Sequence, residues 1–103
     1  MIKHIVMWKL MDFAEGCSRK ENALKIKTML EGLKDKIVQI VKLEVGINLN
    51  DSAMAFDAVL ISEFEDLDKL EIYKNHPEHV KVADFVAKVR QDRAVVDYVM
   101  EEK

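Results

Sequence analysis

Hydrophobic and polar residues alternate along several segments of the chain, and a repeat of two residues predicts β-strands. The alternation is clearest over residues 41–49, where Val, Leu and Ile at the odd positions are separated by Lys, Glu, Gly and Asn. Residues 2–11 and 56–64 alternate as well, but both faces of these strands carry apolar side chains. Residues 94–100 are rich in β-branched residues, which predicts a fourth strand.

Two regions between these strands have the three- and four-residue spacing of amphipathic helices. The first opens with a capping-box pair, Ser18 with Glu21, and its apolar residues recur over residues 23–33. The second contains the chain's one proline, which disfavours helical geometry in the residue before it but suits a first helical turn. We therefore predict a short helix over about residues 67–75 and a longer one over about residues 77–90.

The resulting order, β-α-β-β-α-β, is that of a ferredoxin-like α+β fold, a four-stranded antiparallel sheet with its helices on one face. Apolar residues on both sides of three strands indicate that the helix-free face is covered too. A chain of 103 residues has nothing left to cover it. We therefore predict a homodimer that packs through its sheet faces into a dimeric α/β barrel. Loose alternation in a monomer is the alternative interpretation.

The composition is that of a single soluble domain spanning residues 1–103, because half of the residues are hydrophobic and a third are charged. A net charge of −3 without a basic stripe argues against nucleic acid and anionic membranes as partners. Cys17 is the only cysteine, so no disulfide forms within the chain, and we interpret it as a bystander. No apolar run approaches the roughly 20 residues that span a bilayer. Because Lys3 and Lys9 also interrupt the apolar start too early for a signal peptide, we expect a cytoplasmic protein.

Four polar residues are candidates for a catalytic site. His4 and Asp97 lie on the first and last strands, which are antiparallel neighbours in this fold, while Tyr73 and His79 lie on the two helices that flank the proline. If the strand residues face the helices, all four rim one cavity. An imidazole oriented by a carboxylate can take up a proton at neutral pH, and a tyrosine hydroxyl can donate to an oxyanion. The set suits proton abstraction next to a carbonyl, as in a cyclisation or an isomerisation.

Structural roles compete with each of these assignments. Histidines next to a proline at a helix start, as His76 and His79 are, often cap the helix or lie on the surface. His4 on a strand can be a hydrogen-bonded core or pocket residue, and the helical spacing of Tyr73 is typical of a core position. Asp97, among valines, is harder to explain structurally, because a buried carboxylate is costly unless it is paired.

Other residues are expected to support the same pocket rather than to react. We predict that Trp8, His76 and Phe85 contact a bound ligand. No metal site is predicted, because Pro77 disturbs the helix that would align His76 with His79. The chain has no glycine-rich phosphate loop, and no cofactor is expected.

Five short stretches of the chain carry a family resemblance. They are His4-Ile5-Val6-Met7-Trp8-Lys9-Leu10, Val45-Gly46, Phe64-Glu65-Asp66, Tyr73-Lys74-Asn75-His76-Pro77-Glu78-His79-Val80 and Val95-Val96-Asp97-Tyr98. Together they resemble the stress-responsive A/B barrel domain (Dabb) family, over nearly the whole chain. The resemblance implies a dimeric α+β barrel and a link to stress responses without a defined biochemical activity.

One branch of that family consists of plant polyketide cyclases of the olivetolic acid type. They use a histidine and a tyrosine from the matching helix region, with a strand histidine and an aspartate nearby. The positions in this chain that resemble them are His79, Tyr73, His4 and Asp97.

Three hypotheses about function follow. The favoured one is a stress-type barrel protein of undetermined activity, a homodimer with a pocket for a small hydrophobic ligand between helices and sheet. The alternatives are a cofactor-free lyase, cyclase or isomerase that uses His79 and Tyr73, and a cofactor-free monooxygenase. A gap filled by Trp8 and Phe85 would count against the enzyme hypotheses, whereas an open cavity would support them.

Overall fold

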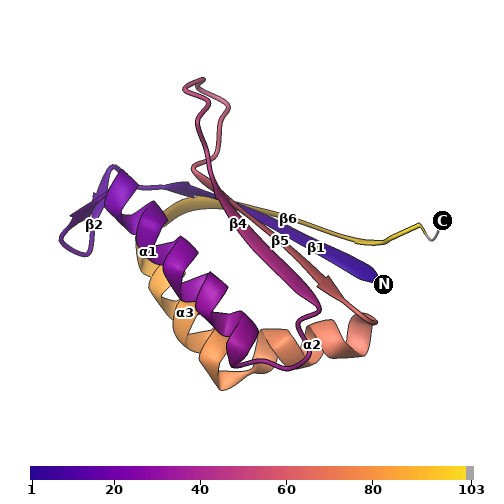
Figure 1. Cartoon of the computed structure of the whole chain (residues 1–103). Helices are drawn as coiled ribbons and strands as arrows, with labels where there is room; N and C mark the ends of the chain where they lie inside the picture. The colour runs from indigo at the N-terminus through magenta and orange to yellow at the C-terminus, as the bar shows by residue number, and fades with distance from the viewer. Residues whose placement is uncertain (102–103) are drawn as a thin grey trace.

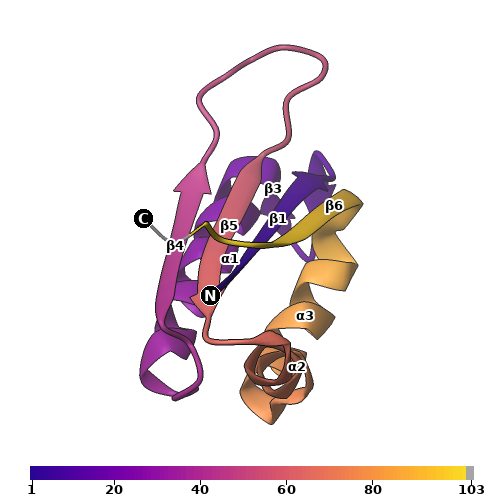
Figure 2. The ribbon, with the colours of Figure 1, turned by 90° about the vertical axis from the view of Figure 1, so that its right-hand side faces the viewer.

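Four long strands form one antiparallel sheet in the computed structural model, which describes residues 1–101. Their order across the sheet is β4 (Lys42–Ile47), β5 (Ala58–Phe64), β1 (Ile2–Leu10) and β6 (Arg90–Val99), as Figure 2 shows. The first and last strands of the chain are therefore neighbours, with His4 opposite Asp97. The predicted strand order is confirmed.

Three α-helices lie on one side of this sheet: α1 (Arg19–Glu31), α2 (Leu67–Asn75) and α3 (Pro77–Val89) (Figure 1). The predicted capping box begins α1, because the side chains of Ser18 and Glu21 each accept a hydrogen bond from the other residue's backbone N–H. The chain is thus the predicted α+β ferredoxin-like fold with its helices on one face. No helix within residues 1–101 is long and apolar enough to cross a lipid bilayer.

Three features differ from the sequence prediction. Strand β6 begins at Arg90 rather than near Ala94, because α3 passes into it without a loop. A small hairpin of β2 (Phe13–Ala14) and β3 (Cys17–Ser18) precedes α1, and a 3-10 turn, η1 (Gly32–Asp35), follows it. The hairpin turns through Glu15 and Gly16, whose φ angles of 51° and 75° are both in the left-handed region that a tight two-residue turn requires.

The core lies between the helices and one face of the sheet. Alternate residues of β1 and β5 point into it, which confirms the predicted division of these strands into two faces. Each fully buried side chain of this size contributes roughly 1.5–3 kcal/mol from burial. The largest of the fully buried side chains are those of Val6, Leu10, Ile26, Leu30, Leu33, Ile37, Val45, Leu60, Phe64, Leu70, Tyr73 and Val89.

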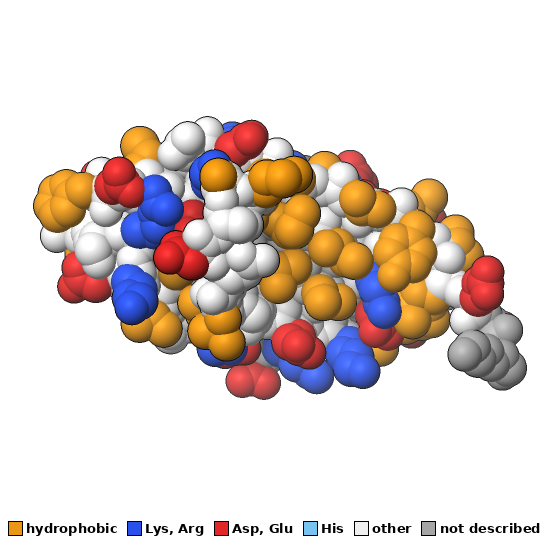
Figure 3. Space-filling view, turned by 90° about the horizontal axis from the view of Figure 1, so that it is seen from above, with side chains coloured by type: hydrophobic (Ala, Val, Ile, Leu, Met, Phe, Trp, Pro, Cys, Tyr) orange, Lys and Arg blue, Asp and Glu red, His pale blue; other side chains and the backbone are white. Residues whose placement is uncertain are grey.

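The opposite face of the sheet carries what we call the apolar strip, seen from above in Figure 3. The strand register places its members on the side away from the helices, and Val96 is 58% exposed. Lys3, Glu44 and Glu63 share this face and border the strip. The strip consists of Ile5, Met7, Val59, Ile61, Val96 and Tyr98.

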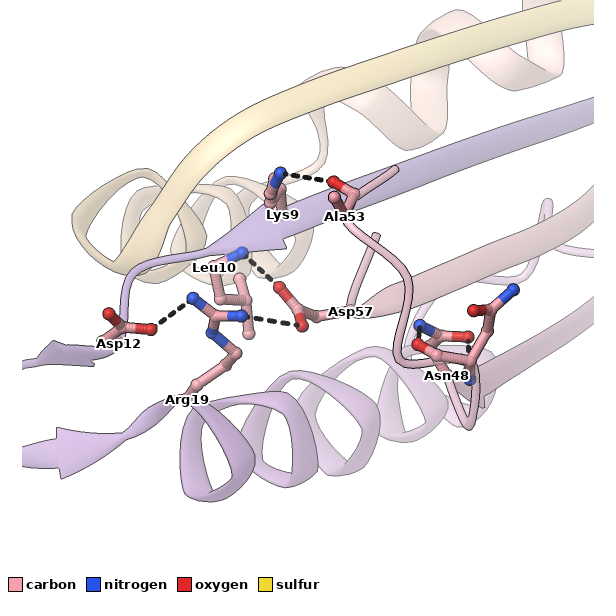
Figure 4. A network of polar contacts seen from close by, with 8 residues as sticks. Lys9, Leu10, Asp12, Arg19, Asn48, Ala53 and Asp57 are labelled. Atoms are coloured by element: carbon pink, nitrogen blue, oxygen red, sulfur yellow. Dashed lines mark hydrogen bonds and ion pairs between the residues drawn. The ribbon is translucent and has the colours of Figure 1, made fainter. Parts of the chain in front are cut away.

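A polar network ties the end of β1 to the loop that joins β4 and β5 (Figure 4). Asp57 is its centre: its Oδ2 accepts from the backbone N–H of Leu10 at 2.7 Å, and its own N–H donates to the carbonyl of Trp8 at 2.8 Å. Arg19, at the start of α1, lies 3.8 Å from the second carboxylate oxygen and also pairs with Asp12. The network fixes the open end of the sheet against the first turn of α1.

Replacing Asp57 should therefore weaken the fold. We expect Asp57→Ala to lower the free energy of unfolding by about 1–3 kcal/mol, because Leu10 loses a charged acceptor. Urea unfolding at equal protein concentration measures the change. Asp51→Ala is the control, since the exposed side chain of Asp51 has no hydrogen bond or ion pair within the described range. Equal losses in the two variants would contradict the role of Asp57.

Candidate functional site

A cavity of about 360 Å³ opens between α3 and the strands β1 and β6. It exists because the helix layer is narrower than the sheet: Val95 of β6 faces the helices, opposite Val6, yet remains 47% exposed. The gap is open and is not filled by Trp8, which forms part of its wall. The lining residues are His4, Val6, Trp8, Leu30, Leu60, Lys74, His79, Val82, Ala83, Val86, Ala87, Arg90 and Arg93.

The strand pair β1 and β6 brings His4 and Asp97 together on the face that looks toward the helices. The Nδ1 of the buried His4 lies 2.5 Å from Oδ1 of Asp97. Burial lowers the pKa of His4, and the bond to Asp97 opposes this only in part. The imidazole is therefore neutral near pH 7 and donates its Nδ1–H to the carboxylate, which leaves Nε2 as an acceptor.

Asp97 is neither fully buried nor unpaired, although its neighbours in the sequence are mostly valines. Its side chain is 30% exposed, and its Oδ2 lies 4.0 Å from the ammonium of Lys74. Water, His4 and Lys74 therefore share the stabilisation of its charge.

His79 lies in the first turn of α3 and lines the cavity. Its Nδ1 is 3.0 Å from the carbonyl oxygen of Lys74, so the neutral ring donates there and keeps Nε2 as an acceptor. Burial lowers the pKa of His79; the bond to the Lys74 carbonyl opposes this in part, and His4 and the positive charge of Arg93 add to the lowering. This imidazole is also neutral near pH 7.

Tyr73 packs between the two histidines but does not line the cavity itself. Its ring centroid lies 4.4 Å from that of His79 and 6.2 Å from that of His4. Its buried hydroxyl has no hydrogen-bond partner in the part of the chain that the structure describes, and burial raises its pKa. The four candidates lie together, but Tyr73 contacts His79 through its ring and not through a hydrogen bond.

Two of the expected ligand-binding residues lie off the cavity wall. The Nδ1 of His76 accepts from the backbone N–H of Glu78 at 3.1 Å, so His76 caps α3, which confirms the structural interpretation of this residue. Phe85 is half-buried and packs against the core. Of the predicted ligand-binding residues, Trp8 alone lines the cavity.

Three charged lining residues were missed by the sequence analysis: Lys74, Arg90 and Arg93. The alternation of the last strand, carried back from Asp97 in steps of two, places Arg93 on the same face and could have identified it. Whether Lys74 and Arg90 line the cavity depends on how the helices pack on the sheet, which the sequence pattern does not show. Among residues 1–101, no group of three or more His, Cys, Asp or Glu side chains could hold a metal ion.

This arrangement can act chemically in two ways. Its two neutral imidazoles can accept a proton from a bound molecule, and its cationic side chains can hold a negative charge. Its apolar walls favour a molecule with a hydrophobic body.

Comparison with known proteins places this chain in a family. The stress responsive A/B barrel domain model matches residues 2–100. The chain belongs to the stress-responsive A/B barrel domain family. A curated member, the stress-response A/B barrel domain-containing protein DABB1 of Arabidopsis thaliana, is 27% identical over 99% of this chain. The chain spans only 48% of the length of that relative.

Solved structures agree with this assignment. A dimeric protein of unknown function and ferredoxin-like fold from Bacteroides fragilis is 36% identical, with a TM-score of 0.82 over 96% of this chain and 95% of that one. A hydroxynitrile lyase from Passiflora edulis has a TM-score of 0.81 at 18% identity, covering 99% of this chain and 94% of the lyase. At that identity the lyase shares the fold alone.

The lowered pKa of the two histidines predicts their titration. We expect both to titrate below pH 6.5, and Asp97→Asn to lower the midpoint of His4 further, because a negative charge that favours the imidazolium is removed. Histidine ring resonances in NMR measure both midpoints. The native state then binds fewer protons than the unfolded chain, so the free energy of unfolding should fall as the pH drops below 6.5.

Asp84→Asn is the control for this titration, because Asp84 is exposed on α3 and does not contribute to either pKa shift. A native midpoint for His4 at or above 6.5, or a higher midpoint in Asp97→Asn, would contradict the neutral assignment.

Proposed function

We propose that this chain, as one domain over residues 1–103, is a homodimer that binds a small, largely apolar molecule in the cavity between α3 and the sheet. The observation that carries the proposal is the open cavity of about 360 Å³. Its size lies in the range of small-molecule sites, and apolar walls with a few convergent polar groups are typical of such sites. Trp8, Leu60 and Val86 form part of the apolar wall, and His4 and His79 supply polar groups.

The homodimer is supported by the apolar strip on the helix-free face of the sheet. A second copy packed on this strip would remove its apolar surface from water, at roughly 25 cal/mol for each Å². The loop of residues 48–57 rises away from the helices in Figure 1, with Leu49 98% and Met54 89% exposed, and would reach a partner on that side. The Bacteroides fragilis relative is itself dimeric.

Blocking the cavity should abolish ligand binding. N-phenyl-1-naphthylamine, an uncharged apolar fluorophore, accepts energy from tryptophan, and Trp8 is the only tryptophan of the chain. We expect it to quench Trp8 in the native protein. Ala83→Phe, on the cavity wall, should weaken binding by about tenfold or more, because the larger side chain occupies the ligand's space.

Val38→Phe is the control, since Val38 is 89% exposed in the segment between η1 and β4 and does not line the cavity. Equal affinities in the native protein and Ala83→Phe would place the probe elsewhere and contradict the proposal.

A second candidate function is proton transfer without a cofactor, as in a lyase or an isomerase. It is favoured by one specific observation: His79 is neutral, bonded through Nδ1 to a carbonyl, and in ring contact with Tyr73. In this role the Nε2 of His79 takes a proton from a carbon next to a carbonyl, and the guanidinium of Arg93 on the same wall stabilises the enolate oxygen. Tyr73, which lies off the cavity wall, positions the His79 ring by ring contact. His4, held by Asp97, supplies a second neutral imidazole.

Proton abstraction can be tested on a simple ketone. In D₂O, we expect the native protein to accelerate exchange of the α-protons of 2-octanone, followed by proton NMR, and His79→Ala to lower that rate by about 10²-fold. His76→Asn is the control, because asparagine keeps a helix cap and removes an imidazole outside the cavity. Exchange no faster than in buffer, or an unchanged rate in His79→Ala, would exclude this function.

A further inference from the structure

The charges on the cavity wall narrow the chemistry of its ligand. Lys74, Arg90 and Arg93 line the cavity, and none of the lining residues, all of them within residues 1–101, is acidic. The chain as a whole carries a net charge of −3. The cavity wall, with three cationic side chains and no carboxylate, is therefore positively charged although the whole chain is negatively charged. Its electrostatic potential favours an anion.

The two guanidinium groups are not used by the fold. Among residues 1–101, neither Arg90 nor Arg93 forms an ion pair with a carboxylate, whereas Arg19 contacts both Asp12 and Asp57. Lys74 differs from the two arginines, because its ammonium already lies near two carboxylates. A guanidinium is a planar fork of N–H donors that matches the two oxygens of a carboxylate.

Arg93 directs its charge toward the histidine end of the cavity. Its backbone pairs with Trp8, so its side chain stands on the face that looks toward the helices. Its positive charge also contributes, after burial, to the lowered pKa of both His4 and His79. An anion held by Arg93 would therefore lie within electrostatic range of both imidazoles. The histidines themselves are neutral, and the carboxylate of Asp97, which bonds to His4 and lies 4.0 Å from Lys74, forms no ion pair with Arg93 within residues 1–101.

Apart from the two histidines, the rest of the cavity wall is apolar and favours a hydrophobic group rather than a charge. Trp8 from β1 and Val82 and Val86 from α3 present apolar surface to the same cavity. An inorganic anion alone would leave this surface exposed to water. A ligand that satisfies both parts carries its charge at one end and a hydrophobic body at the other.

We infer that the cavity binds a small molecule with an apolar body and one carboxylate group, with the carboxylate on Arg93 and Arg90 and the body against Trp8, Val82 and Val86. This inference rests on the proposed ligand-binding function and narrows it to one ligand class.

Two probes of matched shape test the inference: octanoate, and its uncharged amide octanamide. Binding is followed by the fluorescence of Trp8, which reports from the cavity wall. At low salt we expect the native protein to bind octanoate about tenfold more tightly than octanamide, because charge-assisted hydrogen bonds form only with the acid. Arg90→Gln/Arg93→Gln should lose that advantage and keep its affinity for octanamide, which also verifies that the cavity is intact.

The matched control is Lys81→Gln/Lys88→Gln, which removes two exposed positive charges of α3 outside the cavity. It should bind both probes as the native protein does. If this control loses as much octanoate affinity as Arg90→Gln/Arg93→Gln does, the effect comes from general surface charge and the inference is overturned. Equal affinity of the native protein for the two probes would overturn the carboxylate preference while the ligand-binding function stands. Failure of both probes to bind the native protein would count against the ligand-binding function itself.

Discussion

The sheet has apolar side chains on both faces, and the helices of this chain cover only one of them. The apolar surface of α1, α2 and α3 is used on the face that holds Val6 and Leu60. The apolar strip on the other face stays in contact with water in a single subunit. Burial of apolar surface is worth roughly 25 cal/mol for each Å². The proposed dimer therefore depends on a second copy covering this strip.

Strand β1 contributes to both the apolar strip and the cavity, because one of its faces belongs to each. His4 and Trp8 point toward the helices and line the cavity, while Ile5 and Met7 belong to the apolar strip. A partner packed on the strip would hold the strand whose opposite face positions the pocket residues. The cavity itself arises at β6, where the sheet extends beyond the helix layer and α3 stands apart from the edge strand.

The elements and their faces could be predicted because periodicity and capping are local signals. Strand order predicted that His4 and Asp97 lie on neighbouring strands, and the structure places the two side chains at hydrogen-bond distance. Phe85, predicted to contact a ligand, lies off the cavity wall, because it is two residues, about 200° of helix rotation, from Ala83 and Ala87, which line the cavity.

Other features depended on contacts that no local pattern carries. The hairpin through Glu15 and Gly16 involves only two residues in each strand, too few to show a period. The openness of the cavity depends on the width of the helix layer relative to the sheet. The cationic wall follows from that same packing, because Lys74 and Arg90 reach the cavity from the ends of two helices.

Sedimentation velocity across micromolar concentrations tests most directly whether the sheet requires a partner. The native chain should sediment as one species of twice the 11.9 kDa chain mass. Val96→Asp, which places a charge in the apolar strip, should dissociate it, whereas Val38→Asp, at an 89% exposed loop position, should not. A native chain that sediments at 11.9 kDa throughout this range would contradict the account.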